Sequence, residues 1–336
     1  MNIRNLFIIF LFLSIVSCIS GNQNRETDIE RLKLNGQVKS YLKTIHRSSN
    51  ALKDTIETTL KEQHRELTLF DKNGNIIEEI SFKKDGERYK KWISVYNSEG
   101  DEIEKVEIKY PNDTLKRWLN KYDNSGNKIE SLIYDSNDSI LRHTKSSYND
   151  FNKETESTIL KSKKAKNQLV KVGYEYDKDG NRLKTTRHYA DNSKTEWFTK
   201  YDSFGNETEW RVYDRKGNME RIDSTNYIYF DNGKVKEEKM FSSNDIPGVF
   251  GISKYNKNED EIEYIEFLND SITSREIYIY DNNSSQITKY YDSNGELEST
   301  IKLTSEFDEN RNLIKKSKFK NGTLRTIKEY KIEYYK

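Results

Sequence analysis

Tyr122-Asp123-Asn124-Ser125-Gly126-Asn127-Lys128-Ile129 is the stretch that decides the fold, because the chain repeats it with small changes. In each copy an aromatic residue is followed by Asp or Asn, two variable residues, Gly and a polar residue. The Asp side chain can accept a hydrogen bond from a backbone N–H two residues on, and Gly supplies the positive φ that closes a turn. The stretch therefore predicts a β-hairpin turn. Further copies begin at Phe70, Tyr96, Tyr176, Tyr201, Tyr213 and Tyr291.

The copies follow a regular spacing. The leading aromatic residues at 70, 96, 122 and 148 are 26 residues apart, and later ones keep about this period. Looser turns lie midway, beginning at Phe82, Tyr110, Tyr134, Phe267 and Phe319. A turn about every 12 to 13 residues, with alternating apolar and polar residues between turns, is typical of a β-meander. We predict an all-β fold, a long antiparallel up-and-down meander of about 20 strands built from ~25-residue double-hairpin repeats.

The first residues have the character of a signal peptide, which we assign to residues 1–17. Arg4 precedes an apolar run from Leu6 to Ile15 that is too short to span a bilayer. Ile15-Val16-Ser17-Cys18 resembles the lipobox of bacterial lipoproteins, which implies cleavage before Cys18 and lipidation of its thiol. The alternative is an ordinary signal peptide with an incidental cysteine. The non-acidic Ile19 implies, by analogy with Gram-negative lipoproteins, the outer membrane, and which face of it stays open.

The remaining chain divides into a tether and one repeat domain. Residues 18–30, the lipidated Cys18 and the polar stretch after it, are expected to form a flexible tether without structure. The first strand is expected near Leu34, and no linker interrupts the repeat from residue 31 to residue 336. Ala51 to Leu67 is interpreted as a strand because of its threonines, with a short helix as the alternative.

Composition excludes several classes of protein. Cys18 is the only cysteine, so neither an intramolecular disulfide nor a cysteine metal site can form. Removal of residues 1–17 takes away Arg4 and no acidic residue, which leaves 56 basic and 56 acidic residues (57 basic less Arg4). Such a balanced chain has no basic field for nucleic acid. Apolar residues make up only 33% of the chain, but 23 Tyr and 14 Phe favour an ordered protein.

Tyr176-Asp177-Lys178-Asp179-Gly180-Asn181-Arg182-Leu183 resembles the YD repeat of the RHS family, and residues 70 to 325 share its rhythm. The resemblance implies a long antiparallel sheet that spirals, and weakly implies surface binding. A right-handed twist of about 20° per strand would coil such a sheet through about one turn. We therefore expect a twisted or spiralling open sheet. The lysines at positions 315, 316, 318, 320 and 328 are expected to protect its last edge from pairing.

No set of residues predicts catalysis or a cofactor. The four histidines, His46, His64, His143 and His188, are not at metal-ligand spacing from one another. Asp177-Lys178-Asp179-Gly180-Asn181 differs from a calcium loop, because its Gly is fourth and His188 stands where the loop needs Glu. Acidic residues are frequent without forming one distinct pair. We predict a protein that is not an enzyme and has no metal and no small-molecule cofactor.

Two residue sets are candidates for modification or binding. Asp113-Thr114-Leu115, Asp138-Ser139-Ile140 and Asp270-Ser271-Ile272 resemble the acceptor sequence for O-glycosylation in some Bacteroidota, and Asp54-Thr55-Ile56 is a fourth copy. The alternative is turn chemistry followed by the first residue of a strand. Trp197 and Trp210 are one strand period apart, and on one exposed face they could stack on a glycan. The alternative is ordinary packing between strands.

The leading hypothesis is a non-enzymatic, lipid-anchored protein of the cell envelope that presents an extended β-surface to a glycan or protein partner. It rests on the tether, the large repeated surface and the lack of a catalytic set. A second hypothesis is an immunity or antitoxin-like protein that neutralises a secreted toxin. A third is a structural spacer without a specific ligand.

Overall fold

The computed structural model describes residues 25–48, 60–161, 169–242, 248–281 and 284–336. They form one short helix and a 22-stranded sheet. Among them there is no helix with the length and apolar character that a membrane crossing requires. The elements are α1 (Asp28–Arg31), β1 (Val38–Ser48), β2 (Leu60–Phe70), β3 (Ile76–Phe82), β4 (Arg88–Tyr96), β5 (Glu102–Lys109), β6 (Asp113–Tyr122), β7 (Lys128–Asp135), β8 (Ile140–Tyr148), β9 (Glu154–Lys161), β10 (Leu169–Tyr176), β11 (Arg182–His188), β12 (Lys194–Tyr201), β13 (Glu207–Tyr213), β14 (Met219–Tyr229), β15 (Val235–Ser242), β16 (Gly248–Tyr255), β17 (Glu261–Leu268), β18 (Ser271–Asp281), β19 (Ser285–Tyr291), β20 (Leu297–Phe307), β21 (Leu313–Lys320) and β22 (Thr323–Tyr334).

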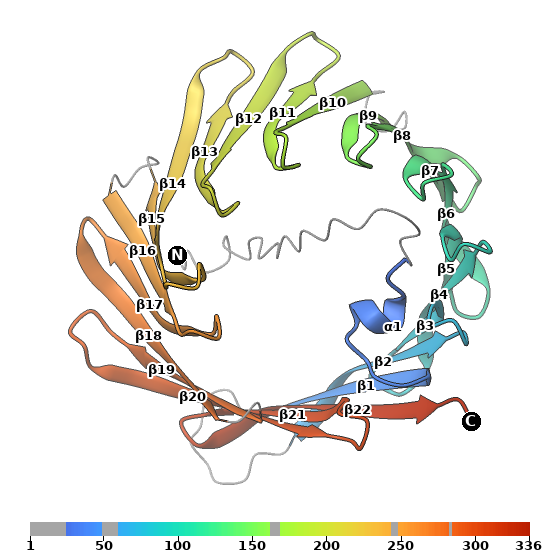
Figure 1. Cartoon of the computed structure of the whole chain (residues 1–336). Helices are drawn as coiled ribbons and strands as arrows, with labels where there is room; N and C mark the ends of the chain where they lie inside the picture. The colour runs from blue at the N-terminus through green and yellow to red at the C-terminus, as the bar shows by residue number, and fades with distance from the viewer. Residues whose placement is uncertain (1–24, 49–59, 162–168, 243–247, 282–283) are drawn as a thin grey trace.

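The strands close into a barrel (Figure 1). Each strand is antiparallel to the next in sequence, and β1 also pairs with β22 from Val38↔Tyr334 to Arg47↔Thr326. The all-β, up-and-down arrangement agrees with the sequence, but the predicted open, spiralling sheet is wrong. The twist of the strands brings the last strand back beside the first, and pairing them removes both edges.

The closing seam also corrects the expectation about the terminal lysines. Lys328 lies in β22 opposite Ile45 of β1, and Lys316 of β21 lies opposite Lys328. β1 and β22 have 11 and 12 residues, so they offer each other a long ladder. The hydrogen bonds of that ladder outweigh the cost of placing lysines beside it, because an open edge would leave the same backbone groups unpaired.

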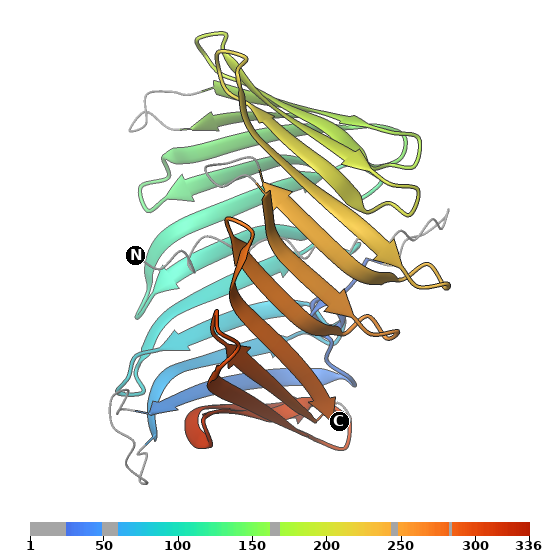
Figure 2. The same cartoon turned by 90° about the vertical axis from the view of Figure 1, so that its left-hand side faces the viewer.

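An up-and-down order places alternate turns at opposite ends of the barrel (Figure 2). We call the end with the turns after the even-numbered strands the motif rim, and the end with the turns after the odd-numbered strands the opposite rim. The residues at 70, 96, 122, 148, 176, 201, 255 and 307 all lead turns at the motif rim. The 26-residue period of the sequence therefore corresponds to two strands and two turns, which take the chain from the motif rim to the opposite rim and back.

The quoted stretch forms the turn that its residues predict. Asp123 N donates to Asn127 O (2.9 Å), and Gly126 N donates to Asp123 O (3.1 Å). Asp123 Oδ1 accepts from the backbone N–H groups of Ser125 and Asn127, both at 2.9 Å. Gly126 has φ +79°, which the turn requires at this point. The ladder shifts register at Tyr122, so this hairpin carries a bulge beside its turn.

The recurring tyrosine completes this turn from the next hairpin. Tyr148 at the end of β8 donates its hydroxyl to the carbonyl of Lys128 (3.1 Å), which lies beyond the last pair of the β7–β8 ladder, Glu130↔Lys145. This carbonyl would otherwise need water. Seven such bonds, of 2.7 to 3.2 Å, join neighbouring hairpins at the motif rim; their donors are Tyr96, Tyr122, Tyr148, Tyr176, Tyr201, Tyr227 and Tyr280.

The end of the expected tether differs from the prediction, because it contains α1. Thr27 and Glu30 form a capping box, and the Asp28 carboxylate accepts from Ile76 N (2.7 Å) and the Tyr96 hydroxyl (3.0 Å). Ile29 packs on a cluster of Val38, Phe70 and Ile76, which are at most 8% exposed. Figure 1 shows α1 inside the ring, so this cluster lies on the inner side of the sheet. Residues 1–24, with Cys18, and residues 49–59 lie outside the described residues.

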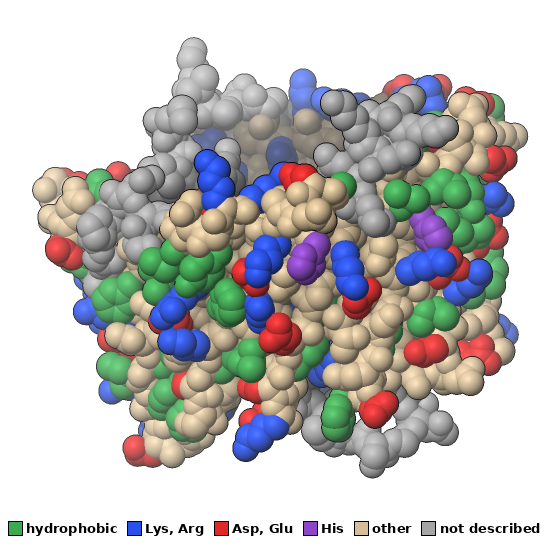
Figure 3. Space-filling view, turned by 90° about the horizontal axis from the view of Figure 1, so that it is seen from above, with side chains coloured by type: hydrophobic (Ala, Val, Ile, Leu, Met, Phe, Trp, Pro, Cys, Tyr) green, Lys and Arg blue, Asp and Glu red, His purple; other side chains and the backbone are tan. Residues whose placement is uncertain are grey.

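The register separates an inner and an outer face of the wall, and both carry ion pairs, such as Lys105–Glu79 (3.0 Å) on the inner face. Tyr41 and Ile332 lie opposite each other and pack on the same cluster as Ile29, so their side of the sheet is the inner face. The outer face carries cross-strand ion pairs such as Lys121–Glu130 (2.7 Å) and Lys254–Glu263 (2.8 Å). Figure 3 shows acidic, basic and hydrophobic side chains intermixed on the outer wall seen from this side.

Candidate ligand-binding wall

All four tryptophans lie on the inner face. The register runs from Tyr41 through Thr68 and Glu79 to Trp92, and directly opposite residues share a face. The same alternation, followed around the sheet, places Trp118 of β6, Trp197 of β12 and Trp210 of β13 on that face. The inner wall is therefore where the large aromatic rings with a polar N–H gather.

Trp197 and Trp210, which the sequence singled out, are brought together. Their strands are neighbours, with Trp197 opposite Val212 and Trp210 opposite Thr199, so the two rings are diagonal partners. Diagonal side chains on adjacent strands are about 7–8 Å apart, within reach of one ligand. Both tryptophans are half-buried. The pair is therefore partly exposed on the lumen side of the wall.

Polar groups surround this pair. The Arg221 guanidinium lies 5.6 Å from the centre of the Trp210 ring, and Arg221 Nε is 2.7 Å from Asp223 Oδ2. Asp223 lies opposite Trp210, and its Oδ1 accepts from the Ser242 hydroxyl (2.7 Å). An aromatic surface flanked by an arginine, a carboxylate and a hydroxyl can stack on a sugar ring and bind its hydroxyl groups.

A second part of the inner wall is rich in tyrosine and glutamate. One cross-strand row from β14 to β19 reads Tyr227, Glu238, Ser253, Tyr264, Glu276 and Tyr290. The Tyr255 hydroxyl donates to Glu238 Oε1 (2.7 Å), and the Tyr278 hydroxyl donates to Glu276 Oε2 (3.0 Å). We call this part of the inner face, from β14 to β19, the acidic-tyrosine wall.

The pKa shifts show that negative charge is concentrated on the acidic-tyrosine wall. Burial, and then the carboxylates of Glu266, Glu276, Glu261 and Glu238, raise the pKa of Tyr264 to about 12. Burial also raises the pKa of Glu261; the charges of Glu238 and Glu276 add to this rise, and the Ser253 hydroxyl opposes it. Each carboxylate therefore makes its neighbours harder to ionise, and a ligand with positive charge or hydroxyl donors would relieve this repulsion.

Gly251 makes room for the rings of this wall. A Cβ at this position would lie 2.8 Å from Met240 Cε and 3.0 Å from Tyr264 Oη. Met240 is directly opposite Gly251 across the β15–β16 ladder. The missing side chain therefore lets Tyr264 and Met240 cover β16, which keeps the inner surface smooth at this point.

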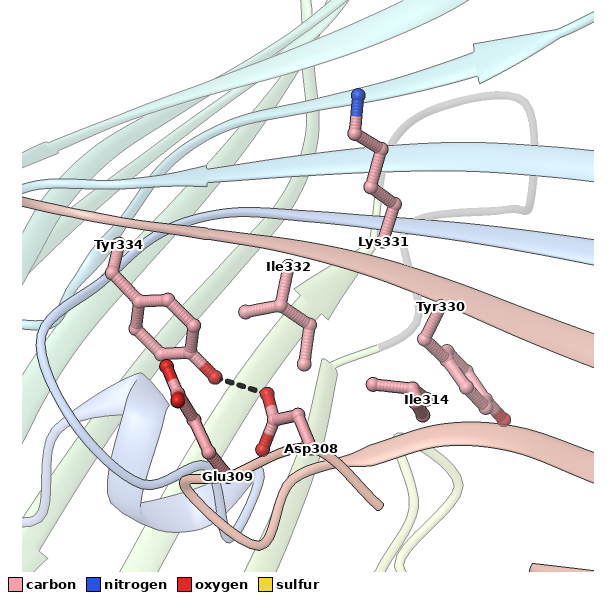
Figure 4. Close-up of a pocket in the computed structure, with 7 residues that line it drawn as sticks. All are labelled: Asp308, Glu309, Ile314, Tyr330, Lys331, Ile332 and Tyr334. Carbon is pink, nitrogen blue, oxygen red and sulfur yellow. Dashed lines mark hydrogen bonds between the residues drawn. The ribbon is translucent and has the colours of Figure 1, made fainter. Parts of the chain in front are cut away.

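A cavity of about 480 Å³ lies at the motif rim between β20 and β22 (Figure 4). Ile314, Tyr330 and Ile332 form an apolar side, and Lys331 points away from it (Figure 4). The Tyr334 hydroxyl donates to Asp308 and accepts from Asn312 Nδ2 (2.7 Å). These polar groups bind one another and hold the β20–β21 turn, so the cavity is better explained by the turn than by a ligand.

A shallower groove of about 410 Å³ lies on the outer wall behind the tryptophan pair. Phe198 and Tyr213 meet edge to face in it, with ring centres 5.5 Å apart. Lys184 covers Phe198 at 5.1 Å and pairs with Glu196 (3.1 Å). The Phe198 ring is thus already covered by a cation of the same wall.

The three predicted acceptor residues are exposed. Thr114, Ser139 and Ser271 lie in or beside turns after β5, β7 and β17, so all three are on the opposite rim. The fourth copy, at Thr55, lies outside the described residues.

Three histidines lie near carboxylates: His143 is 2.7 Å from Glu130, His46 is 3.1 Å from Glu329 and His64 is 3.6 Å from Glu66. Across the described ranges no group of three or more His, Cys, Asp or Glu could hold a metal ion.

Sequence reasoning missed that Trp92 and Trp118 share the inner face with the pair, and it missed the acidic-tyrosine wall. Period-2 alternation within one strand already aligns Trp92 with Tyr96 and Trp118 with Tyr122, and the motif tyrosines mark the inner face. The glutamates have no comparable signal, because their cross-strand row depends on bulges that shift the register of each hairpin.

No protein-family model and no curated protein matches this sequence. Among solved structures, the Tc toxin complex TcdB2-TccC3-Cdc42 matches with a TM-score of 0.40 and 12% identity over 85% of this chain and 17% of that chain. The Photorhabdus luminescens Tc holotoxin pore matches with a TM-score of 0.38 and 11% identity over 79% and 15%. A porin-like protein from Bacteroides uniformis matches with a TM-score of 0.28 and 9% identity over 89% and 99%. The chain spans less than a fifth of the toxin chains, and such scores carry no function to it.

Proposed function

We propose that the protein is a non-enzymatic, lipid-anchored barrel of the cell envelope whose inner wall binds a carbohydrate chain. The observation that carries this proposal is the Trp197–Trp210 pair, half-buried on the inner face beside Arg221 and Asp223. The partner is a glycan, and we expect neither nucleic acid nor a small-molecule cofactor. The extended surface foreseen from the sequence is then the inside of the barrel.

The dimensions of the barrel suit an enclosed ligand. Twenty-two strands about 4.8 Å apart give a circumference of about 105 Å and a diameter of roughly 35 Å between backbones, before strand tilt widens it. Inner side chains reduce this width from all sides, but they leave space for a chain of sugar rings. Several of the buried inner residues are small and polar, such as Ser94, Ser157 and Thr288, so the inner side chains are short at these positions.

Membrane attachment is assigned to the lipid on Cys18 rather than to the wall of the barrel. A wall that faces lipid carries an outward apolar band, whereas this outer face carries ion pairs such as Lys200–Glu209 (3.0 Å). The charged outer wall is compatible with an aqueous environment, and the lipidated tether is compatible with attachment to the outer membrane. Several acyl chains on one cysteine would hold it there firmly.

The experiment that tests the glycan site is a binding screen with the lipidated, full-length protein on a glycan array, followed by titration calorimetry of any hit. The double variant Trp197→Ala/Trp210→Ala should weaken binding by about tenfold per ring, because each loses a stacking partner. The matched control is Trp92→Ala/Trp118→Ala, which removes two inner-face tryptophans elsewhere on the wall and should leave affinity unchanged. No bound glycan, or equal losses in both double variants, would contradict the proposal.

The acidic-tyrosine wall favours a second candidate, the capture of a basic protein segment as an immunity-like protein would do. Glu238, Glu261 and Glu266 share the inner face there, and the raised pKa of Glu261 reflects burial and the nearby carboxylates. Glu238→Gln/Glu266→Gln should weaken a basic protein ligand and spare a neutral glycan. Co-purification of an exported protein encoded beside this chain, lost in that variant, would favour capture over glycan binding.

We also propose that Thr114, Ser139 and Ser271 carry O-linked glycans. Their exposure at turns of one rim supports access for a transferase. Mass spectrometry of the mature protein should find a glycan on these residues and lose each one in Thr114→Ala, Ser139→Ala or Ser271→Ala. Unmodified peptides at all three positions would dispose of the idea and leave the turn explanation.

A further inference from the structure

Two turns of the motif rim carry an exposed phenylalanine at their tip. Phe151, after β8, is 82% exposed, and Phe204, after β12, is 58% exposed. Both occupy the third position after the leading tyrosine. At the same position the neighbouring turns carry polar residues, namely Asn73, Glu99, Ser125 and Asp179. The turn itself therefore needs no aromatic side chain at its tip.

The turn geometry fixes where these tips lie. Phe151 N donates to Asn149 Oδ1 (3.1 Å), and Phe204 N donates to Asp202 Oδ1 (2.9 Å). These are the same Asx bonds that hold the polar tips, so both backbones have the standard turn. The Phe204 ring also contacts the Tyr229 ring, with centres 4.4 Å apart, which gives it a fixed direction. The two turns are four strands apart, about 20 Å along the rim.

The chain enters the barrel at this same rim. Arg25 Nη1 lies 2.6 Å from Asp101 Oδ1 in the turn after β4. Cys18 is seven positions earlier, a reach of at most about 25 Å. Strands of 7 to 12 residues make the barrel wall about 23 to 40 Å long. A tether that crossed the lumen would use its whole length, so an anchor on Cys18 holds the motif rim near the bilayer.

We propose that the motif rim docks on the surface of the lipid bilayer, with Phe151 and Phe204 inserted among the headgroups. The inference rests on the proposed lipid anchor. Exposed aromatic rings lose contact with water when they enter the interface, and rings of this kind prefer that depth. The turns of this rim carry both acidic residues, Glu99 and Asp179, and basic residues, Lys72 and Lys178, so the rim suits zwitterionic lipid.

Docking at this rim orients the whole barrel. One mouth of the lumen then faces the bilayer, and the opposite rim, with Thr114, Ser139 and Ser271, points away from it. A ligand of the inner wall would enter through the opposite rim. The lipid on Cys18 keeps the protein at the membrane, and the two rings keep the barrel upright on it.

The test uses the mature lipidated protein in phosphatidylcholine vesicles. The sulfur of Cys18 carries the lipid, so an introduced cysteine is the one free thiol. A fluorophore on Ser125→Cys reports on the motif rim, and the same fluorophore on Asn137→Cys reports on the opposite rim; both positions are exposed. We expect lipids with a nitroxide at the headgroup to quench the label at 125 and to spare the label at 137.

A variant separates docking from anchoring. Phe151→Ser/Phe204→Ser in the Ser125→Cys background should lose the quenching while the protein still floats with the vesicles. Equal quenching at 125 and 137, or quenching at 125 that survives the double substitution, would overturn the proposal. Protein that fails to float and whose Cys18 has an unmodified mass would overturn the anchor itself, and the docking with it.

Discussion

The two rims of the barrel are built from the same strands but are held in different ways. At the motif rim, seven tyrosine hydroxyls join neighbouring hairpins, and α1 lies across the turns after β2 and β4. At the opposite rim the turns vary, from copies of the quoted turn at Asp214 and Asp292 to a two-residue turn at Asn269-Asp270. The seven tyrosine bonds to backbone carbonyls all lie at the motif rim.

The comparison shows what a repeated sequence element is for. A hairpin ladder alone aligns two strands, whereas the tyrosine bond also fixes the distance between hairpins. The Tyr335 hydroxyl extends this bracing across the seam by donating to the carbonyl of Phe70 (2.6 Å). The motif rim is thus braced at seven junctions between hairpins and across the seam, and the opposite rim is free to carry varied turns and candidate modification sites.

The largest expected effect is at the base of α1. Phe70→Ala removes a side chain that is 1% exposed from the cluster with Val38 and Ile76, and should cost about 3–5 kcal/mol of unfolding free energy. The control is Phe82→Ala, a half-buried residue of the adjacent strand at the opposite rim, with a cost of no more than about 2 kcal/mol. Denaturant titrations give both values. Equal losses would show that the rims are held alike.

A smaller effect tests the brace directly. Tyr148→Phe removes the hydroxyl bond to Lys128 O and should cost about 0.5–1.5 kcal/mol. Tyr134→Phe, at the end of β7 on the opposite rim, keeps its ring beneath Arg117 and should cost less than about 0.5 kcal/mol. Amide hydrogen exchange should show faster opening of the turn after β6 in the first variant alone. If Tyr148→Phe left the free energy of unfolding unchanged, water would replace the hydroxyl as the partner of the Lys128 carbonyl at no cost in stability.

The smallest effect at neutral pH concerns the turn aspartate. The Asn127 side chain, and then the backbone N–H groups of Asn127 and Ser125, hold the pKa of Asp123 below its usual range, with burial acting against them. Its stabilising contribution is therefore present above the unfolded pKa of about 3.9 and is lost as pH falls through the lower folded value. Asp123→Asn should leave stability near pH 7 within about 0.5 kcal/mol and reduce its loss in acid.

The reverse substitution is a matched control for this pH effect. Asn149 occupies the same position in the turn after β8, and its Oδ1 accepts the same bond from the N–H of Lys153 (3.0 Å). Asn149→Asp should add acid sensitivity in the same pH range. Identical acid unfolding curves for the two variants and the parent protein would show that the turn carboxylates do not control it.

Much of this architecture could be predicted from sequence, because its signals are local. The Asp-x-x-Gly turn, the 26-residue period and the midway turns are contained in short stretches, and the structure assigns them to two rims. Trp197 and Trp210 could be paired because their separation equals one strand period. The exposure of Thr114, Ser139 and Ser271 follows from their position at turns.

Closure and the inner face could not be predicted in this way. The seam joins residues nearly 300 positions apart, such as Thr44 and Glu329, and depends on twist summed over every strand. The concave face is defined only once the ring closes, so the acidic-tyrosine wall has no local signature. Helix α1 did leave a signal, since Thr27-Asp28-Ile29-Glu30 is a capping box sequence, but four residues do not form a helix without the cluster beneath them.

The measurement that tests closure most directly is a disulfide across the seam. Thr44 of β1 and Glu329 of β22 are directly opposite, and such pairs have Cα atoms about 4.5–5.5 Å apart, within disulfide range. In protein whose Cys18 is lipidated, Thr44→Cys/Glu329→Cys should oxidise to one intramolecular crosslink, seen by peptide mass. Thr44→Cys/Ser317→Cys, two strands apart, should stay reduced. Free thiols in the first variant, or crosslinks only between molecules, would contradict a closed barrel and the enclosed binding wall that depends on it.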